Sequence, residues 1–307
     1  MLKYVVKKLI LLIPILLCVS TVVFFMIHLI PGDPAQILAG EQASPQDIEN
    51  LRKQLGLDKP LWVQYVTFLE KAAKLDFGRS LRTNEEVLSE IKDRYPNTLR
   101  LAFSATLFSI LVGIPIGVFA SLKRNSILDG LSMTAALLGM AMPDFWLGLI
   151  LIYCFGVKLR WLPVMGFDTF RHMVLPTITL GSFATAYVAR MTRSSMLETL
   201  RQDYILAARA KGLSLRTVLF KHALKNSLIP VVTVIGLGFS FMLGGSFIIE
   251  TVFAINGLGW LVVRAILMRD FPVVQGGIFL ISSTFVIVNI LVDIAYAYLD
   301  PRIKFRD

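Results

Sequence analysis

The feature that most limits the possible folds is a series of long apolar runs with very few charges. A helix needs about 20 mostly apolar residues to cross the roughly 30 Å hydrocarbon core of a bilayer. The runs that we expect to cross the membrane are residues 9–30, 101–122, 129–158, 173–189, 227–249 and 271–292. Only 17% of the residues are charged, against about a quarter in soluble domains. The sequence therefore predicts an all-α integral membrane protein with six transmembrane helices.

Basic residues outside these runs predict the orientation. The first run is too long for the apolar part of a signal peptide, so we expect a retained helix. Lys and Arg favour the cytoplasmic side in short loops, and they gather before residue 9 and in 123–124, 190–225 and 302–306. We therefore expect both termini to be cytoplasmic. Because the net charge of +10 is confined to such segments, we attribute it to membrane orientation and expect no nucleic-acid partner.

The chain divides into three expected parts. These are residues 1–30 with the first span, an extracytoplasmic helical subdomain at 31–99, and a five-helix core at 100–307. Within the subdomain we expect three helices. Ser44, Asp47 and Gly56 suit the start and end of the first, Pro60 suits the start of the second, and Asn84 the start of the third. The subdomain could be a lid over the spans or a docking surface, and the sequence favours neither.

Two spans carry small residues at every fourth position, which predicts close packing of helices. Membrane helices approach closely through small side chains. The stripes are Ala105, Ser109, Gly113, Gly117 and Ser121 in the second span, and Gly236, Ser240 and Gly244 in the fifth. Pro14, Pro115 and Pro143 are expected to kink the first three spans, as membrane helices tolerate.

A few polar residues fall within or beside the spans, where they are costly and therefore often functional or internally paired. We take Asp144, Glu250 and Asn289 as candidates for a translocation pathway. For Asp144, lining the pathway and a merely tolerated acid are equally favoured. For Glu250, a solvated helix end or a structural pairing is the competing interpretation. Asp293 is expected to make a structural hydrogen bond or ion pair, and His28 to lie at the membrane interface.

Known catalytic and metal-binding patterns are absent from the sequence. It contains no Gly-Lys dipeptide and hence no P-loop, and its three histidines lie on separate segments. Cys18 and Cys154 both fall in apolar runs. We therefore expect no catalytic residue, metal site or cofactor in this chain. A transporter of this kind would use an ion gradient through Asp144 or Asp293, or ATP hydrolysed by another chain; a membrane enzyme has little support.

A short basic helix is expected at residues 203–210, between the fourth and fifth spans. Asp203 suits its N-cap, Arg209 and Lys211 its last turn, and Gly212 the left-handed position after it. Ser214 suits the cap of a second helix over residues 215–224, so we expect helix, sharp turn and helix, nearly parallel to the membrane. The alanines leave a low surface into which another chain could fit. They are Ala207, Ala208 and Ala210.

The stretch "DYILAARAKGLSLRTVLFKHALKNSLIPVVTV" resembles the cytoplasmic loop of ABC-importer permeases in the dipeptide/oligopeptide/nickel branch. Ala207, Ala208, Gly212 and Leu224 match the general permease signature. Three positions depart from it but agree with the peptide branch: Leu206, His222 and Lys225. Other similar motifs, in chain order, are "HLIPGDPA", "DFGRSLRT", "MPDFWLG", "ARMTRSSMLE", "GGSFIIETVFAINGLGWL" and "LVDIAYAYLDPRIKF". At Asn256 the branch usually has Pro.

This resemblance implies a type I ABC-importer permease fold and a transport function in a bacterial or archaeal cytoplasmic membrane. It implies a second homologous permease, two ATP-binding subunits that hold ATP and Mg²⁺, and an extracytoplasmic substrate-binding protein. The substrate would be a dipeptide, an oligopeptide, glutathione, a nickel complex or a related solute. The loop at 192–226 would contact the ATPases through a coupling helix, so this chain would not itself be an enzyme. The implied coupling residues are Asp203, Ala207, Ala208, Arg209, Lys211, Gly212 and Leu213.

Overall fold

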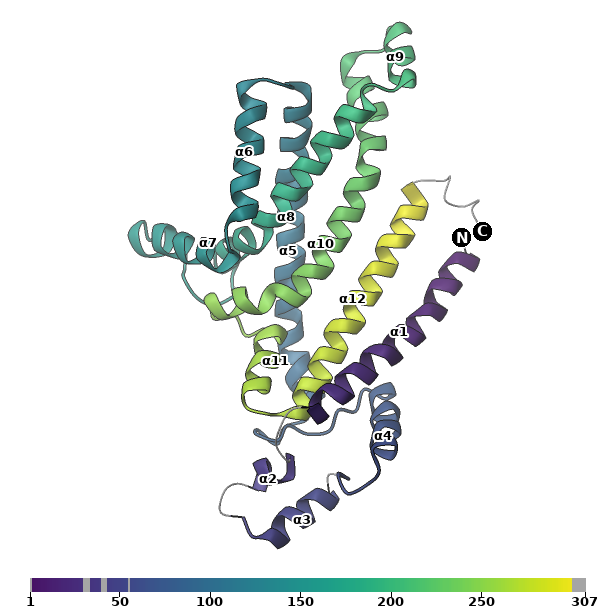
Figure 1. Ribbon diagram of the computed structural model, residues 1–307. Coiled ribbons are helices and arrows are strands. Elements are labelled where there is room, and N and C mark those ends of the chain that lie inside the picture. Colours follow the sequence, from purple (N-terminus) through teal and green to yellow (C-terminus); the bar gives the residue numbers. More distant parts are fainter. Residues whose placement is uncertain (1, 30–33, 40–42, 55, 300–307) are drawn as a thin grey trace.

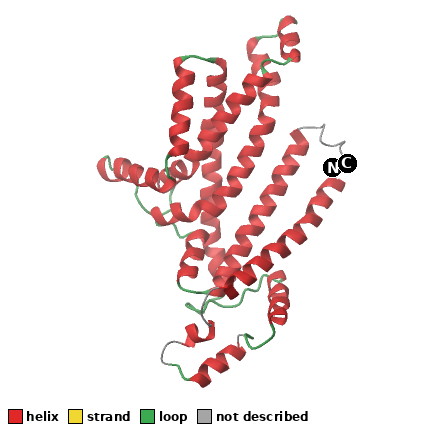
Figure 2. Ribbon diagram, viewed as in Figure 1, coloured by secondary structure: helices red, strands yellow, loops and turns green. Residues whose placement is uncertain are grey.

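The computed structural model describes residues 2–29, 34–39, 43–54 and 56–299, and helices make up nearly all of them (Figure 2). The helices, in chain order, are α1 (Leu2–Leu29), α2 (Pro34–Ala39), α3 (Pro45–Gln54), α4 (Leu61–Ala73), α5 (Val87–Leu122), α6 (Ile127–Ala141), α7 (Asp144–Leu151), η1 (Ile152–Lys158), α8 (Phe170–Thr199), α9 (Asp203–Ala210), η2 (Thr217–Leu224), α10 (Lys225–Val252), α11 (Leu258–Leu267) and α12 (Phe271–Leu299). The two η elements are π-helical, with wider turns than an α-helix. No strand occurs in the described ranges, which agrees with the predicted all-α class.

Three described helices are long and apolar enough to cross a membrane. They are α5, the continuous helix formed by η2 and α10, and α12 as far as Val292. The pair formed by α6 and α7–η1 would be a fourth if it counts as one broken span. The apolar stretch described in α1, Ile10–Phe25, is shorter than a full span, and α8 is long but polar and basic toward its end. The expected number of six spans therefore stays a prediction.

The third expected span, residues 129–158, is not one continuous helix. It breaks between α6 and α7, whose directions differ by 105°. Met142 adopts an extended conformation, with ψ of 128°, which the ring of Pro143 favours for the residue before it. The break places Asp144 in the first turn of a new helix. Pro14 and Pro115, by contrast, lie inside helices that continue past them.

The helices form an elongated bundle with two distinct ends (Figure 1). At one, the α9 end, lie α9 and the turn between α5 and α6. At the other, the α11 end, lie α11 and the helices α2, α3 and α4. The basic segments expected on the cytoplasmic side, residues 123–124 and those around α9, thus share one end of the bundle.

The centre of the bundle is the pair α5 and α8, which approach closely through small residues. All five members of the predicted stripe on α5 are buried. A Cβ atom on Gly113 would lie 2.8 Å from the carbonyl oxygen of Thr185, and one on Gly117 would lie 2.5 Å from that of Ala189. The stripe on α10 is confirmed only in part: Gly236 meets Val292 of α12, but Gly244 is exposed.

In the small segment before α5, the first two predicted helices are confirmed. Asp47 N donates to Ser44 Oγ at 3.2 Å and Ser44 N to Asp47 Oδ2 at 3.3 Å, which is the reciprocal capping expected from their spacing. Gly56 has a φ of +70°, and α4 begins directly after Pro60. The third predicted helix is confirmed only in part: residues 87–94 are helical, but they are the first turns of the 36-residue α5, and Asn84 lies before it and does not cap it.

Candidate functional site

The candidate site is α9, which stands out from the α9 end of the bundle (Figure 1). Its start differs from the prediction, because Gln202 occupies the N-cap position without a side-chain cap and Asp203 lies in the first turn. There the carboxylate still faces the positive end of the helix dipole. Its end agrees with the prediction. Gly212 has a φ of +76°, and its N–H and that of Leu213 donate to the carbonyls of Arg209 and Ala208, the paired bonds of a Schellman motif.

One face of α9 is seated on the bundle. Ile205 and Ala208 are buried in an apolar cluster with residues of α5, α8 and η2. Those residues are Val118, Met196, Val218, Leu219 and Ala223. Ala208 therefore belongs to the seat of the helix, unlike the other predicted coupling residues. Because the side chain of Ala208 is small, α9 can lie close to the residues of α5, α8 and η2 on which it packs.

The opposite face of α9 is exposed and largely small or apolar. Leu206 is 55% exposed and Leu213 41%. The other exposed members of this face are Ala207, Arg209, Ala210 and Lys211. Exposed apolar surface of this kind marks contact sites, and the two bases add positive charge at its rim.

The segment after α9 is capped as expected but does not stop. Ser214 Oγ accepts from Thr217 N at 3.3 Å, yet the helix that begins there continues through η2 into α10. The prediction of a second separate helix parallel to the membrane was wrong. The start of α9 is also tied to α10, since Asn226 Nδ2 donates to Tyr204 Oη at 2.8 Å.

An ion pair close to this site was missed by the sequence analysis. Arg193 of α8 donates through Nε and Nη2 to the two carboxylate oxygens of Asp129, both at 2.6 Å. Asp129 is buried in the first turn of α6 and also accepts from the N–H of Asn125. A bidentate pair fixes the relative orientation of two helices. The only sequence signal was an acid at the beginning of one apolar run and a base just beyond the end of another.

The pathway candidates are not joined to one another by hydrogen bonds among the described residues. The half-buried carboxylate of Asp144 has no hydrogen-bond or ion-pair partner in that part of the chain. Asn289 donates to the carbonyl of Phe285 in its own helix, at 3.0 Å. Their role in a pathway stays a prediction. The side chains of His28 and Asp293 lie outside the described residues.

Glu250 is completely buried, so the interpretation as a solvated helix end was wrong. Its Oε1 accepts from Thr98 Oγ1 at 2.7 Å and Ser246 Oγ at 3.0 Å, and its Oε2 accepts from Trp260 N at 2.7 Å. The carboxylate thus caps the first turn of α11, whose own N-cap is Gly257. A Cβ atom on Gly257 would lie 2.3 Å from Glu250 Cδ, so only glycine leaves room. This is a structural pairing, and in this conformation the carboxylate reaches no surface.

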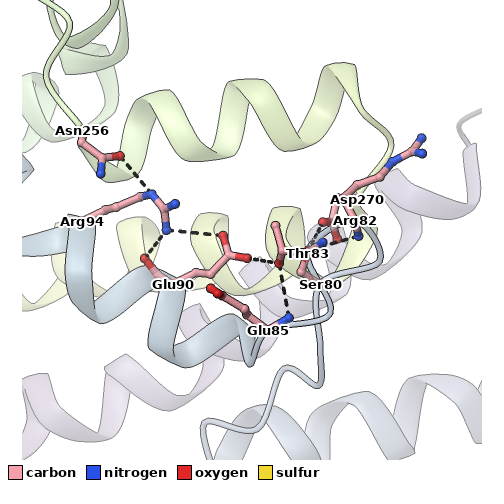
Figure 3. Close-up of polar contacts among 8 residues, drawn as sticks. All are labelled: Ser80, Arg82, Thr83, Glu85, Glu90, Arg94, Asn256 and Asp270. Atoms are coloured by element: carbon pink, nitrogen blue, oxygen red, sulfur yellow. Dashed lines mark hydrogen bonds and ion pairs between the residues drawn. The ribbon is translucent and has the colours of Figure 1, made fainter.

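Further polar contacts fasten the loops around α11 to the beginning of α5 (Figure 3). Asp270 accepts from Ser80 Oγ at 2.5 Å and Leu81 N at 3.1 Å. Arg94 bridges Glu90 and Asn256, donating to the Asn256 side-chain oxygen at 3.0 Å. Asn256, where the branch usually has Pro, thus has a specific partner here. These contacts of Asp270 and Asn256 join residues 160 or more positions apart in sequence, which explains why no local pattern indicated them.

Comparisons with known proteins agree with the fold. Residues 113–305 match the family model described as "Binding-protein-dependent transport system inner membrane component", and residues 1–102 match its N-terminal counterpart. A chain of the MetNI methionine ABC transporter, in an inward-facing structure, covers 69% of this chain and 97% of its own length, with a TM-score of 0.56. Its sequence identity of 18% shows a shared fold alone.

Relatives with known names match along the whole chain. The dipeptide transport system permease protein DppB of Alkalihalophilus pseudofirmus is 44% identical, covering 99% of this chain and 100% of the relative. The glutathione transport system permease protein GsiC of Escherichia coli K12 is 45% identical over the full length of both chains. These matches favour an ABC-transporter permease over the ion-gradient-driven transporter. The chain belongs to the family of inner membrane components of binding-protein-dependent transport systems, and it is a transport permease located in the membrane.

Proposed function

We propose that this permease imports a short peptide or a peptide-like thiol such as glutathione, delivered by an extracytoplasmic binding protein. A second, homologous permease would complete the pathway, and two separate ATP-binding subunits would hold ATP and Mg²⁺ and hydrolyse the nucleotide. The named relatives support this substrate class, since one is a dipeptide permease and the other a glutathione permease.

The observation that carries the proposal is the two-faced structure of α9. Its inner face is seated on α5, α8 and η2 through Ile205 and Ala208, and its outer face offers a low apolar surface with two bases. An ATPase bound to the outer face would move the helices beneath α9 with it, because the inner face of α9 is packed against them and its C-terminal end is closed by the Schellman motif. The energy of ATP would thereby change the relative population of bundle conformations.

The contact surface proposed for the ATPase consists of residues on the outer face and at the capped end of α9. They are Ala207, Arg209, Lys211, Gly212 and Leu213, with Asp203 at the opposite end of the helix. Asp144 and Asn289 remain our candidates for contact with solute, because Asp144 is half-buried and unpaired in the described chain. Glu250 is assigned to support of α11 and not to the pathway.

The first test is to block the outer face of α9. Ala207→Trp fills an exposed small-residue position without disturbing the buried seat. We expect it to weaken co-purification of the ATP-binding subunits at least about tenfold, equivalent to ~1.4 kcal/mol, and to abolish uptake. The matched control is Gln46→Trp, which places the same side chain at an exposed position of α3 at the α11 end. Equal recovery of the ATP-binding subunits and equal uptake in both variants would contradict the assignment of α9.

The energy source and the substrate are tested with the complete transporter in membrane vesicles. Uptake of labelled dipeptide and glutathione should stop when ATP hydrolysis is blocked with vanadate and continue when an ionophore collapses the ion gradients. The reverse pattern would support the ion-driven alternative. If neither solute is taken up but ATPase activity still responds to a binding protein, the substrate assignment fails while the transport mechanism stands.

A further inference from the structure

The helix α4 has three faces of different character. One face, with Tyr65, Phe68 and Ala72, packs inward. A second face, beside it, is apolar but exposed: Trp62 is 70% exposed and Val66 44%. The third face is polar and exposed, and its members are Thr67, Glu70, Lys71 and Lys74. An exposed apolar face beside an exposed polar face is typical of a helix that lies at a membrane surface.

The place where α4 contacts α1 indicates how deep in the membrane the exposed apolar face of α4 would lie. Tyr65 Oη and Thr21 Oγ1 share a hydrogen bond of 2.6 Å, and Phe25 stacks on Tyr65 with ring centroids 6.4 Å apart. Thr21 lies eight residues before the last residue of α1, which corresponds to about 12 Å along the helix axis. The apolar stretch described in α1, Ile10–Phe25, is about 24 Å long by the same measure, and Thr21 lies inside it. The contact with α4 therefore lies within the apolar length of α1 and not beyond its end.

The exposed apolar face of α4 lies beside an apolar surface of α1. Val22 is 61% exposed, and Phe25 is also exposed next to Tyr65. Val22 belongs to the expected first span, so its natural surroundings are lipid. Because the rings of Phe25 and Tyr65 stack, the exposed apolar surfaces of α1 and α4 are neighbours. The same surroundings would therefore cover both surfaces. Tryptophan prefers the boundary between headgroups and acyl chains, and Lys71 and Lys74 can extend toward headgroup phosphates from the adjoining polar face.

We infer that α4 is an interfacial helix that lies in the bilayer surface at the α11 end, with Trp62 and Val66 among the acyl chains and Thr67 facing water. The partner of this face is thus lipid, not protein. It would hold the segment from α2 to α4 at a fixed height. The helix α3 would then stand in the aqueous phase, because its exposed residues Gln46, Asp47 and Glu49 are polar. The inference is independent of the substrate and of the role of α9.

Adjacent residues of α4 provide a matched test. Cysteine is introduced singly by Val66→Cys or Thr67→Cys, in a chain whose own Cys18 and Cys154 are replaced by alanine. Each variant is labelled with a nitroxide and reconstituted, as the full chain alone, in phosphatidylcholine–phosphatidylglycerol vesicles. At position 66 we expect collisions with oxygen, which concentrates in acyl chains, to exceed those with a water-soluble nickel chelate. At position 67 the order should be reversed.

A second measurement uses the native side chain. In vesicles of brominated lipid, the parent protein should lose more tryptophan fluorescence than the Trp62→Phe variant, because Trp62 would lie next to the bromine atoms. Equal accessibility of positions 66 and 67 to the nickel chelate would overturn the inference. Shielding of position 66 that arises only when a partner protein is added would also overturn it, and would assign this face to a protein interface.

Discussion

The two ends of the bundle are held together by different chemistry. At the α11 end, buried polar groups such as Glu250 and Asp270 bind partners far away in sequence. At the α9 end, α6 and α8 are joined by the ion pair of Asp129 and Arg193, but α9 itself rests on an apolar cluster and has one side-chain hydrogen bond to α10, between Asn226 and Tyr204. Buried polar networks specify one arrangement and are costly when half-satisfied, whereas apolar contacts allow a seated helix to tilt. The comparison indicates a fixed α11 end, and at the other end a helix α9 whose apolar support permits movement.

The largest effect on stability should come from removing the carboxylate of Glu250, which accepts several of the buried hydrogen bonds at the α11 end. Glu250→Ala leaves the hydroxyls of Thr98 and Ser246 and the N–H of Trp260 without their acceptor. Because each buried unpaired donor costs about 1–3 kcal/mol, we expect the free energy of unfolding to fall by at least ~3 kcal/mol. It can be measured by SDS titration of the protein in mixed micelles. Glu250→Gln keeps one acceptor oxygen and should lose less; an alanine variant as stable as the parent would remove the basis of the comparison.

A smaller and more local effect is expected in the seat of α9. Ile205→Ala deletes a fully buried side chain, and truncations of this kind cost about 2–5 kcal/mol. Since the cluster lies at one end of the bundle, we expect faster tryptic cleavage at Arg209 and Lys211 while the rest of the chain stays resistant. Leu206→Ala, on the exposed side of the same helix, should change the cleavage rate little. If both variants behave alike, α9 is not held by this seat.

The smallest effect concerns the end of α9. A Cβ atom on Gly212 would meet nothing within 4 Å, so Gly212→Ala tests the left-handed conformation alone. The conformational cost for an L-residue is about 1 kcal/mol, which should raise local opening about fivefold, as measured by hydrogen exchange of the Leu213 amide. Gly212→Asn should lie between parent and alanine variant, because asparagine tolerates this conformation better. Equal exchange in all three proteins would show that the Schellman turn does not limit opening.

Sequence reasoning succeeded where the determining interactions are local. Ser44 and Asp47 lie three residues apart and cap the same helix, and Gly212 closes the turn that its position suggested. The small residues of α5 also indicated its buried face, because a spacing of four residues repeats along one side of a helix. Each of these features depends on residues within about one or two helical turns of one another.

Reasoning from the sequence failed where distant parts of the chain decide the outcome. Thr98, which donates a hydrogen bond to Glu250, lies 152 residues away from it in the sequence. Nothing beside either residue indicates this hydrogen bond. Pro143 predicted a kink, but no local pattern indicated a bend as large as 105° or the packing of α7 against α8 and α10. The charged residues between 85 and 94 suggested a separate helix, although α5 continues through them without a break.

The length of α5 has a mechanical consequence. Its 36 residues extend about 54 Å, with Thr98 in the polar network of the α11 end and Val118 in the seat of α9. Between them, Gly113 and Gly117 bring its backbone against α8 so closely that even a methyl group would collide. Helices in such contact cannot slide past each other by a turn without losing the fit. A displacement of α9 by a partner would therefore be carried by α5 and α8 as one unit.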